Sequence, residues 1–364
     1  MKDRSHDTGL FPFLAALLRG PIQRKPSTLE RLGWQSVFAQ QTDIDELART
    51  PPVRVVEVHR NGLHVLGQAI DATLPPNPEA TVGDWLLYDA GLPGRSRLLE
   101  RKSLIRRRAP GTDRQVQLIA ANLDTAFIVT SCNHDFNVAR LERFVALAFE
   151  AGVAPVILLT KPDLCPEAER EGYEAAAGAI SDRVPVIAVN ARGGEAAAAL
   201  ADYTRPGQTV AFLGSSGVGK STLVNALAGV DAVATQAIRE DDSKGRHTTT
   251  RRQLHLLPGG CAVLDTPGMR ELQLTEARAG IAELFQDLDD LAATCRFRDC
   301  RHESEPGCAV KAAMADGRVE AARVERWRKL AREEAFNSAT LAERKAKDRA
   351  LSRLVREAQK RDRD

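Results

Sequence analysis

The spacing of hydrophobic positions changes twice along the chain. From about Trp34 to Ala109, short β-favouring runs alternate with turns, and no long helical period occurs. From about Gln115 to Asp265, apolar strand-like runs alternate with amphipathic helical stretches. Beyond Asp265 the chain has a helical period and is rich in charge. These changes predict three structural regions in one chain.

The first region has the pattern of short strands joined by turns. Val53–Val58 and His64–Ala69 are β-favouring, and the Asn61-Gly62 pair between them is a strong hairpin signal. Further strands are expected at Asp84–Tyr88 and Arg97–Glu100. Short strands without a long helix are typical of small barrels, so we predict an OB-type barrel.

The second region alternates strands with helices. This alternation predicts an α/β fold, with a parallel sheet covered by helices on both faces. The expected strands are 125–130, 154–159, 184–189 and 209–213, and the expected helices are 138–150, 167–180 and 196–202.

Composition narrows the functional classes. The 364 residues carry a formal net charge of +2, so overall charge gives no argument for nucleic acid. No apolar run approaches the roughly 20 residues that span a bilayer, and no small-residue cleavage site follows Leu10–Leu18. Six cysteines are too few for a disulfide framework at this length. We therefore expect a cytoplasmic protein without a membrane segment.

Basic residues concentrate in two places. Leu341–Asp364 carries nine Lys and Arg against five Asp and Glu, an excess that could meet RNA. The other cluster lies at the far end of the predicted barrel, and it is either a phosphate-contacting surface or a solvated run of charge. Its members are Arg95, Arg97, Arg101, Lys102, Arg106, Arg107 and Arg108.

A phosphate-binding loop follows the strand 209–213 and precedes a helical run. Its sequence fits G-x-x-x-x-G-K-[ST], and strand, glycine-rich loop and helix is the setting in which this motif binds nucleotides. Backbone N–H groups and the helix N-terminus favour an anion there. We expect Lys220 to reach the β- and γ-phosphates and Ser221 to bind Mg²⁺. The expected nucleotide-binding residues are Gly214, Ser215, Ser216, Gly217, Val218, Gly219, Lys220, Ser221 and Thr222.

A second segment, T-K-P-D, identifies the base. It follows a predicted strand, at the edge where α/β sheets bind ligands. The Asp163 carboxylate suits the N1 and N2 donors of guanine, a pair that adenine lacks, and Lys161 would pack along the base. Taken alone, Asp163 also fits a helix N-cap. The expected guanine-site residues are Thr160, Lys161, Pro162 and Asp163, with Asn190 and Ala191 contributing backbone groups.

Two further segments have the character of nucleotide switches. A D-T-P-G segment follows an apolar strand, so Asp265 can hold Mg²⁺ through water and the Gly268 N–H can contact the γ-phosphate. The polar segment Lys244–Thr250 suits a loop whose threonine senses that phosphate, and the sequence leaves the choice among Thr248 to Thr250 open.

The order of these motifs is unusual. The base-reading segment precedes the phosphate loop and the D-T-P-G switch comes last, whereas a conventional GTPase has its phosphate loop first. This order predicts a circularly permuted GTPase domain, in which the last switch leads directly into the C-terminal region.

That C-terminal region contains three cysteines and a histidine within fourteen residues. Such a set suits a closed tetrahedral Zn²⁺ site, which has no position for water and is therefore structural. The expected ligands are Cys295, Cys300, His302 and Cys308. The remaining cysteines, Cys132, Cys165 and Cys261, lie in or beside predicted strands and are expected in the core.

The combined motifs resemble the bacterial ribosome small-subunit-dependent GTPases of the RsgA/YjeQ type. The resemblance covers nearly the whole chain from about Trp34. Threonine at position 160 and Asn190 depart from the usual GTPase residues, but Asp163 is retained. The motifs that carry the resemblance are Val82–Trp85, Ala121–Asp124, Thr160–Asp163, Gly214–Thr222, Gly245–Thr250, Asp265–Gly268 and the Cys/His cluster.

The resemblance implies a domain arrangement and a role. The implied domains are an OB-fold RNA-binding domain (34–109), a circularly permuted GTPase domain (110–272) and a zinc-knuckle domain in the region 273–364. The resemblance does not assign the N-terminal extension (1–33) or the basic helical tail that ends the last region. The implied role is late maturation of the 30S ribosomal subunit, through 16S rRNA binding, subunit-stimulated GTP hydrolysis and release of assembly factors. We expect a monomer with one structural Zn²⁺ and with Mg²⁺ bound beside GTP. An RNA-binding scaffold with purely structural GTP is the alternative, and Asp163 argues against an ATP-dependent kinase.

A catalytic role for His247 can be tested directly. Met269 stands where Ras-like proteins carry a water-orienting glutamine, so intrinsic turnover should be slow. His247, in the predicted switch loop, is the internal candidate for the missing group, unless it only contacts RNA. We expect His247→Ala to lower the subunit-stimulated kcat and to change the slow intrinsic rate little. Hydrolysis assays with and without 30S subunits measure both rates, and an unchanged stimulated kcat removes His247 from the mechanism.

Overall fold

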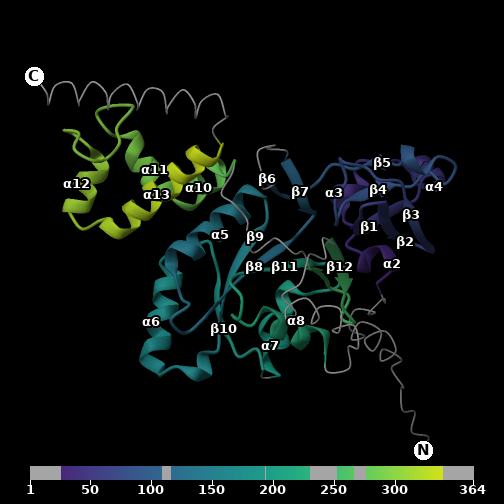
Figure 1. Ribbon diagram of the computed structural model, residues 1–364, viewed down its shortest axis with the longest axis horizontal. Helices are drawn as coiled ribbons and strands as arrows, with labels where there is room; N and C mark the ends of the chain where they lie inside the picture. Colours follow the sequence, from purple (N-terminus) through teal and green to yellow (C-terminus); the bar gives the residue numbers. More distant parts are fainter. Residues whose placement is uncertain (1–25, 109–115, 193, 230–251, 266–275, 339–364) are drawn as a thin grey trace, which may run out of the picture.

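The computed structural model of the chain describes residues 26–108, 116–192, 194–229, 252–265 and 276–338 (Figure 1). A small antiparallel sheet with short helices lies at one end of the molecule, a parallel sheet with helices lies in the middle, and a helical group lies at the other end. The chain passes through these parts in the order that the changes of hydrophobic period predicted.

The first part consists of short helices and an antiparallel sheet. The helices are α2 (Thr28–Arg31), α3 (Ser36–Ala39) and α4 (Ile44–Arg49), with the 3-10 turn η1 (Pro93–Arg95). The strands are β1 (Pro52–His59), β2 (Gly62–Gly67), β3 (Ile70–Leu74), β4 (Trp85–Leu87) and β5 (Arg97–Leu98). They pair in the order β3-β2-β1-β4-β5.

The predicted hairpin between β1 and β2 is present. Its turn consists of Arg60 and Asn61, because His59 pairs with Gly62. Strand β3 and the three helices are additions to the sequence prediction, since helices of four to six residues carry too little periodic pattern to be recognised. Helix α2 lies within the segment assigned to the N-terminal extension. The helices pack on the strands, where the rings of Trp34 and Trp85 lie 4.9 Å apart.

The central sheet confirms the predicted α/β pattern. Its parallel strands run in the order β10-β9-β8-β11-β13. Helices α5 and α6 share one hydrophobic cluster with the sheet and α7 and α8 share another, so both faces are covered. The strands are β8 (Thr125–Ser131), β9 (Ala154–Thr160), β10 (Val186–Val189), β11 (Thr209–Leu213) and β13 (Ala262–Asp265). The helices are α5 (Val138–Glu150), α6 (Glu167–Gly178), α7 (Glu195–Ala199) and α8 (Lys220–Ala228), with the 3-10 turns η2 (Pro162–Leu164) and η3 (Ala201–Tyr203).

One strand joins the first part to the central sheet. Strand β12 (Arg252–Leu256) is antiparallel to β13 on one side and to β1 on the other, with Gln253 opposite both Asp265 and Glu57. A separate two-stranded sheet is formed by β6 (Leu104–Arg108) and β7 (Val116–Ala121). The sequence did not predict the pairing of β1 with β12, which joins the two sheets. The two strands lie far apart along the chain, and the residue pattern of neither strand indicates its partner.

The C-terminal part packs against α5. Its helices are α10 (Arg278–Leu284), α11 (Gln286–Ala293), α12 (Ala309–Ala315) and α13 (Ala321–Ser338). Helix α10 approaches α5 so closely that a Cβ atom on Gly280 would lie 2.0 Å from the carbonyl oxygen of Ala146. Glu142 of α5 is fully buried, and both of its carboxylate oxygens accept from Nε of Arg326 on α13 at 2.9 Å. None of the helices within the described residues has the length and apolar character needed to cross a membrane.

Removing Arg326 is expected to weaken the attachment of the C-terminal part. In Arg326→Met the buried Glu142 loses its ion-pair partner, which should cost about 3–5 kcal/mol of unfolding free energy. Burial raises the pKa of Glu142 and the Arg326 guanidinium opposes this rise. Without Arg326 the carboxyl should protonate more readily, so the destabilisation should shrink as the pH falls.

Urea unfolding at several pH values measures this effect. Arg332→Met is the matched control, because Arg332 and its partner Glu325 are both 62% exposed and such a pair is worth below about 1 kcal/mol. Equal stability of the two variants at neutral pH would contradict the assignment.

Candidate nucleotide and metal sites

The predicted phosphate loop lies between β11 and α8. Three of its glycines have positive φ, with values of +143° at Gly214, +80° at Gly217 and +99° at Gly219. A Cβ atom on Gly214 would lie 2.2 Å from the carbonyl oxygen of Val129 in β8. Glycine is therefore required at the start of the loop, both for its backbone conformation and for the close approach of β8.

Lys220 is the first residue of α8, and its ammonium group lies across the loop. Nζ donates to the carbonyl oxygen of Gly214 at 2.9 Å and to that of Ser215. Ser221 follows in the first turn of the helix and is half-buried. The ammonium group and the helix N-terminus both bring positive charge to the loop, an arrangement that favours a polyphosphate.

The T-K-P-D segment lies directly against the phosphate loop. The hydroxyl of Thr160, at the end of β9, lies 2.6 Å from the carbonyl oxygen of Val218 and 3.1 Å from that of Thr130. Lys161 has a left-handed backbone, with φ of 58°, and its Nζ donates to the carbonyl oxygen of Gly217 at 2.9 Å. Two segments that are separate in the sequence therefore meet at one sheet edge.

The remaining predicted base-site residues lie at the same edge. Pro162 and Asp163 form the 3-10 turn η2, and the Asp163 side chain is exposed. Asn190 and Ala191 follow β10, whose last residue, Val189, is in register with Thr160. The Asn190 side chain accepts from the N–H of Arg192 at 3.0 Å, which holds the turn after β10.

The predicted switch residues lie almost entirely outside the described residues. Asp265 is the last residue of β13, which pairs with β11, so its backbone lies beside the strand that leads into the phosphate loop. The segments Lys244–Thr250, which includes His247, and Thr266–Met269, which includes Gly268, are not described.

The four predicted metal ligands converge. The ligand atoms of Cys295, Cys300, His302 and Cys308 all lie within 4.8 Å of one another. His302 Nδ1 lies 3.6 Å from Cys295 Sγ and 3.4 Å from Cys308 Sγ, and the two sulfur atoms are 3.9 Å apart. In a tetrahedral site with Zn–S bonds of about 2.3 Å, sulfur atoms lie about 3.8 Å apart, so the residues fit such an ion.

Backbone hydrogen bonds favour a thiolate at Cys295, whereas burial and the neighbouring thiols raise the pKa of Cys300 to about 11 in the absence of a metal ion. The N–H of Ala309 donates to Cys295 Sγ at 3.3 Å, and the N–H of Lys311 donates to Cys308 Sγ at 3.4 Å. Burial opposes ionisation of Cys295, but the hydrogen-bond donors outweigh it and lower the pKa of this thiol. The ring of Trp327 stacks on His302, with centroids 5.3 Å apart, and ties the cluster to α13.

The other cysteines are core residues, as predicted. Cys132 and Cys261 are buried in the hydrophobic clusters of the central sheet, and half-buried Cys165 packs against one of them. Burial raises the pKa of both Cys132 and Cys261 to about 12, so these side chains remain thiols at neutral pH.

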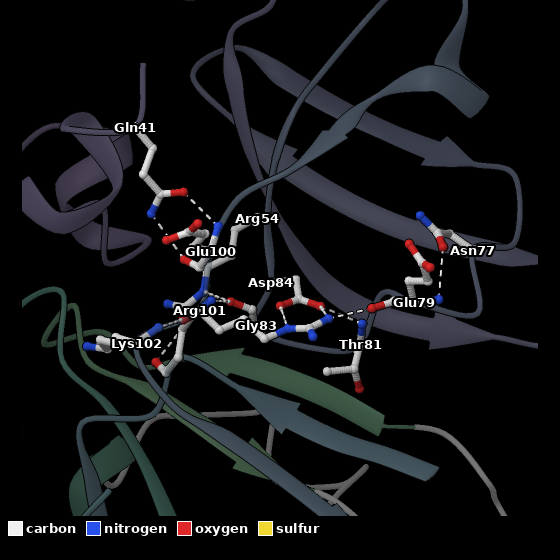
Figure 2. Close-up of polar contacts among 11 residues, drawn as sticks. Gln41, Arg54, Asn77, Glu79, Thr81, Gly83, Asp84, Glu100, Arg101 and Lys102 are labelled. Carbon is white, nitrogen blue, oxygen red and sulfur yellow. Dashed lines mark hydrogen bonds and ion pairs between the residues drawn. The ribbon is translucent and has the colours of Figure 1, made fainter. Parts of the chain in front are cut away.

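Several residues of the basic cluster have side-chain partners that the sequence did not reveal. Arg101 donates twice to the fully buried carboxylate of Asp84, at 2.7 and 2.8 Å (Figure 2). Arg101 and Lys102 are only 20% and 19% exposed, so neither belongs to a solvated run or an open phosphate-contacting surface. The partners are Glu46 for Arg97, Asp84 for Arg101, Asp124 for Lys102, Glu276 for Arg106 and Gln117 for Arg107.

Arg54 of β1 is a second buried cation at this boundary. Its guanidinium donates to the carbonyl oxygens of Leu32, of Gly83 at 3.3 Å and of Asn122 at 3.3 Å. Gly83 and Arg54 lie beside Asp84 and Arg101 in Figure 2. Burial lowers the pKa of Arg54 to about 10, so the side chain is still charged at neutral pH. A signal for this cluster was present in the motifs Val82–Trp85 and Ala121–Asp124, whose contacts the sequence could not show.

Two family models match the chain. One, described as RsgA GTPase, matches residues 98–275. The other, described as ABC transporter, matches residues 202–353, a range that includes the phosphate loop shared by P-loop NTPases.

Curated proteins and solved structures agree with the first model. "Small ribosomal subunit biogenesis GTPase RsgA 2" of Vibrio parahaemolyticus is 48% identical over 331 residues, covering 90% of this chain and 92% of the relative. RsgA of Mesorhizobium japonicum is 49% identical over 319 residues, covering 85% and 91%. YjeQ from Thermotoga maritima aligns with a TM-score of 0.55 at 25% identity, covering 77% of this chain and 96% of that one. YloQ, described as a circularly permuted GTPase, aligns with a TM-score of 0.53 at 22% identity, covering 80% of this chain and 97% of that one. The chain therefore has the circularly permuted GTPase fold and belongs to the RsgA family of GTPases.

Proposed function

We propose that this GTPase acts in late maturation of the 30S ribosomal subunit, where it binds 16S rRNA and hydrolyses GTP in response to the subunit. The observation that carries the nucleotide specificity in this proposal is the contact of the T-K-P-D segment with the phosphate loop, through Thr160 and Lys161. The relatives named as small ribosomal subunit biogenesis GTPases support the choice of partner. Hydrolysis would be coupled to release of assembly factors and of the protein itself.

The chain's own residues divide the binding of GTP between base and phosphates. Asp163 would accept from guanine N1 and N2, with Asn190 and Ala191 lining the pocket through their backbones. The phosphate loop from Gly214 to Thr222 would surround the phosphates, and Lys220 would exchange its loop carbonyls for phosphate oxygens. Thr160 and Lys161 would keep the two halves of the site together, because both already bind the loop's carbonyl groups.

Hydrolysis requires groups near the γ-phosphate. Ser221 and Asp265 would hold Mg²⁺, an ion that neutralises charge on the phosphates during transfer. The Gly268 N–H would contact the γ-phosphate, and His247 is our candidate for the group that acts on water. Because Met269 cannot orient water, the subunit would have to order the catalytic arrangement.

The parts outside the nucleotide site would serve the ribosome. We infer that residues 34–109 form an OB-type barrel for RNA, residues 110–272 the GTPase domain and residues 273–364 a metal-knuckle domain with a basic tail. Residues 1–33 would be an extension. The proposed role implies a cytoplasmic location, and we expect the protein to act as a monomer.

The Cys/His cluster would hold one structural Zn²⁺. Three sulfur atoms and one imidazole nitrogen within 4.8 Å of one another match the ligand preference of this ion, and a fourth protein ligand leaves no open position for chemistry. The ion would link the loop 295–308 to α12 and, through the stacked ring of Trp327, to α13.

Subunit dependence is the decisive test of the proposed function. Purified 30S subunits should raise kcat for GTP hydrolysis by at least about tenfold, because they would order the catalytic groups around the γ-phosphate. Steady-state phosphate release with and without subunits measures this. Lys220→Ala should abolish the stimulated rate, and excess ATP should not displace a bound guanine nucleotide. Failure of 30S subunits to accelerate the wild-type chain would overturn the proposal.

Removing the metal should unfold the knuckle and leave the nucleotide site intact. Cys308→Ser is expected to lose the bound zinc and the helical signal of the C-terminal part, while GTP affinity stays within about threefold. Elemental analysis, circular dichroism and nucleotide titration report the three quantities. Cys165→Ser is the matched control and should retain one zinc per chain. A Cys308→Ser chain that keeps its zinc would exclude the assigned ligand set.

A further inference from the structure

Lys102 lies at the boundary between the first part and the central sheet. It follows β5, its side chain is 19% exposed, and its ammonium group pairs with the carboxylate of Asp124, which is 15% exposed (Figure 2 shows the position of Lys102). The same ammonium donates to the side-chain oxygen of Gln35, beside helix α3, at 3.1 Å. The Lys102 ammonium group therefore binds side chains within the protein, and little of its surface is available to a phosphate group of RNA.

Asp124 connects this ammonium group to the strand that carries the phosphate loop. One carboxylate oxygen accepts from Lys102 and from Gln35, and the other accepts from the N–H of Thr209 at 2.7 Å. The Asp124 N–H in turn donates to the carbonyl oxygen of Thr209 at 2.8 Å. Thr209 is the first residue of β11, and Gly214 follows directly after the last.

Strand β11 rigidly connects Thr209, which binds Asp124, to Gly214 at the start of the phosphate loop. All five of its residues are buried, and it pairs in parallel with β8 on one side and β13 on the other. At the end of β11 that leads into the phosphate loop, Gly214 lies so close to the carbonyl oxygen of Val129 that no side chain would fit between them. A displacement at Thr209 would therefore be carried along the strand rather than absorbed by loose packing.

We propose that Lys102 is a positioning residue for GTP hydrolysis, which transmits the docking of the first part on RNA to the phosphate loop through Asp124 and β11. The inference rests on the proposed function, because it requires a ribosomal partner on the first part of the chain. It assigns to Lys102 a role that differs from that of a surface cation, whose loss would weaken RNA binding rather than slow hydrolysis.

Other contacts keep the first part in place when Lys102 is changed. Strand β1 pairs with β12, and the N–H of Ala121 donates to the carbonyl oxygen of Val82 at 2.9 Å. Arg54 separately binds carbonyl groups from three segments, and its charge lies near Asp124. A Lys102 variant should therefore fold with its parts attached, and Asp124 would still face a positive charge.

The test uses three variants of the full chain. Lys102→Met removes the ammonium group and keeps the stem, Lys102→Arg retains a cation that can pair with Asp124, and Arg95→Met removes an exposed cation from the same region. For each we would measure the intrinsic rate, the kcat at saturating 30S subunits and the subunit concentration giving half of that rate. Thermal unfolding of each variant reports whether the fold is retained.

Lys102→Met should lower the stimulated kcat by about tenfold or more, while the intrinsic rate and the half-saturating subunit concentration stay within about threefold of wild type. Lys102→Arg should restore most of the stimulated kcat, and Arg95→Met should leave it unchanged. A higher half-saturating concentration with unchanged kcat in Lys102→Met would make this residue an RNA contact and overturn the inference. Equal stimulation of wild type and Lys102→Met, even with lowered stability, would overturn it as well. Absence of stimulation in the wild type would instead overturn the proposed function, and the inference with it.

Discussion

The nucleotide site depends on the parallel register of β11 beside β8. With Leu213 opposite Ile128, the chain leaves β11 next to the carbonyl group of Val129, and only glycine can make the turn there. Strand β9 lies on the other side of β8, with Thr160 opposite Ser131. The loops after β9 and β11 therefore emerge at one edge of the sheet and can bind each other. The order of the motifs along the chain does not affect this meeting, which explains how a permuted sequence retains one nucleotide site.

Buried charges lie in the first part and at its junction with the central sheet. Transfer of a guanidinium or a carboxylate from water into the interior is costly, and burial lowers the pKa of Arg54 and raises that of Asp84 accordingly. The cost is offset by bidentate contact between Arg101 and Asp84 and by the carbonyl groups around Arg54. Such contacts are directional. The Arg101–Asp84 pair joins two segments within the first part, and the contact of Arg54 with the carbonyl oxygen of Asn122 crosses to the segment that precedes β8.

The C-terminal part is attached to α5, a helix of the central α/β region. Helix α5 connects β8 to β9 along the chain, and both strands end at the nucleotide edge of the sheet. The helix contacts Gly280 of α10 and Arg326 of α13. Packing at backbone contact distance leaves little freedom for sliding. The described residues therefore link the Cys/His cluster to the central sheet through α13 and α5.

The sequence by itself determined the local features. The phosphate loop, the T-K-P-D segment, the four metal ligands and the strands of the central sheet were predicted, because each depends on spacing and residue type within a short segment. Only the tertiary structure decided the pairing of β12 with β1 and the internal partners of Arg101 and Lys102. A run of arginine and lysine has the same pattern whether its charges face solvent or buried carboxylates. The partners come from distant segments, so the choice is made by how the chain folds rather than by any pattern within the run.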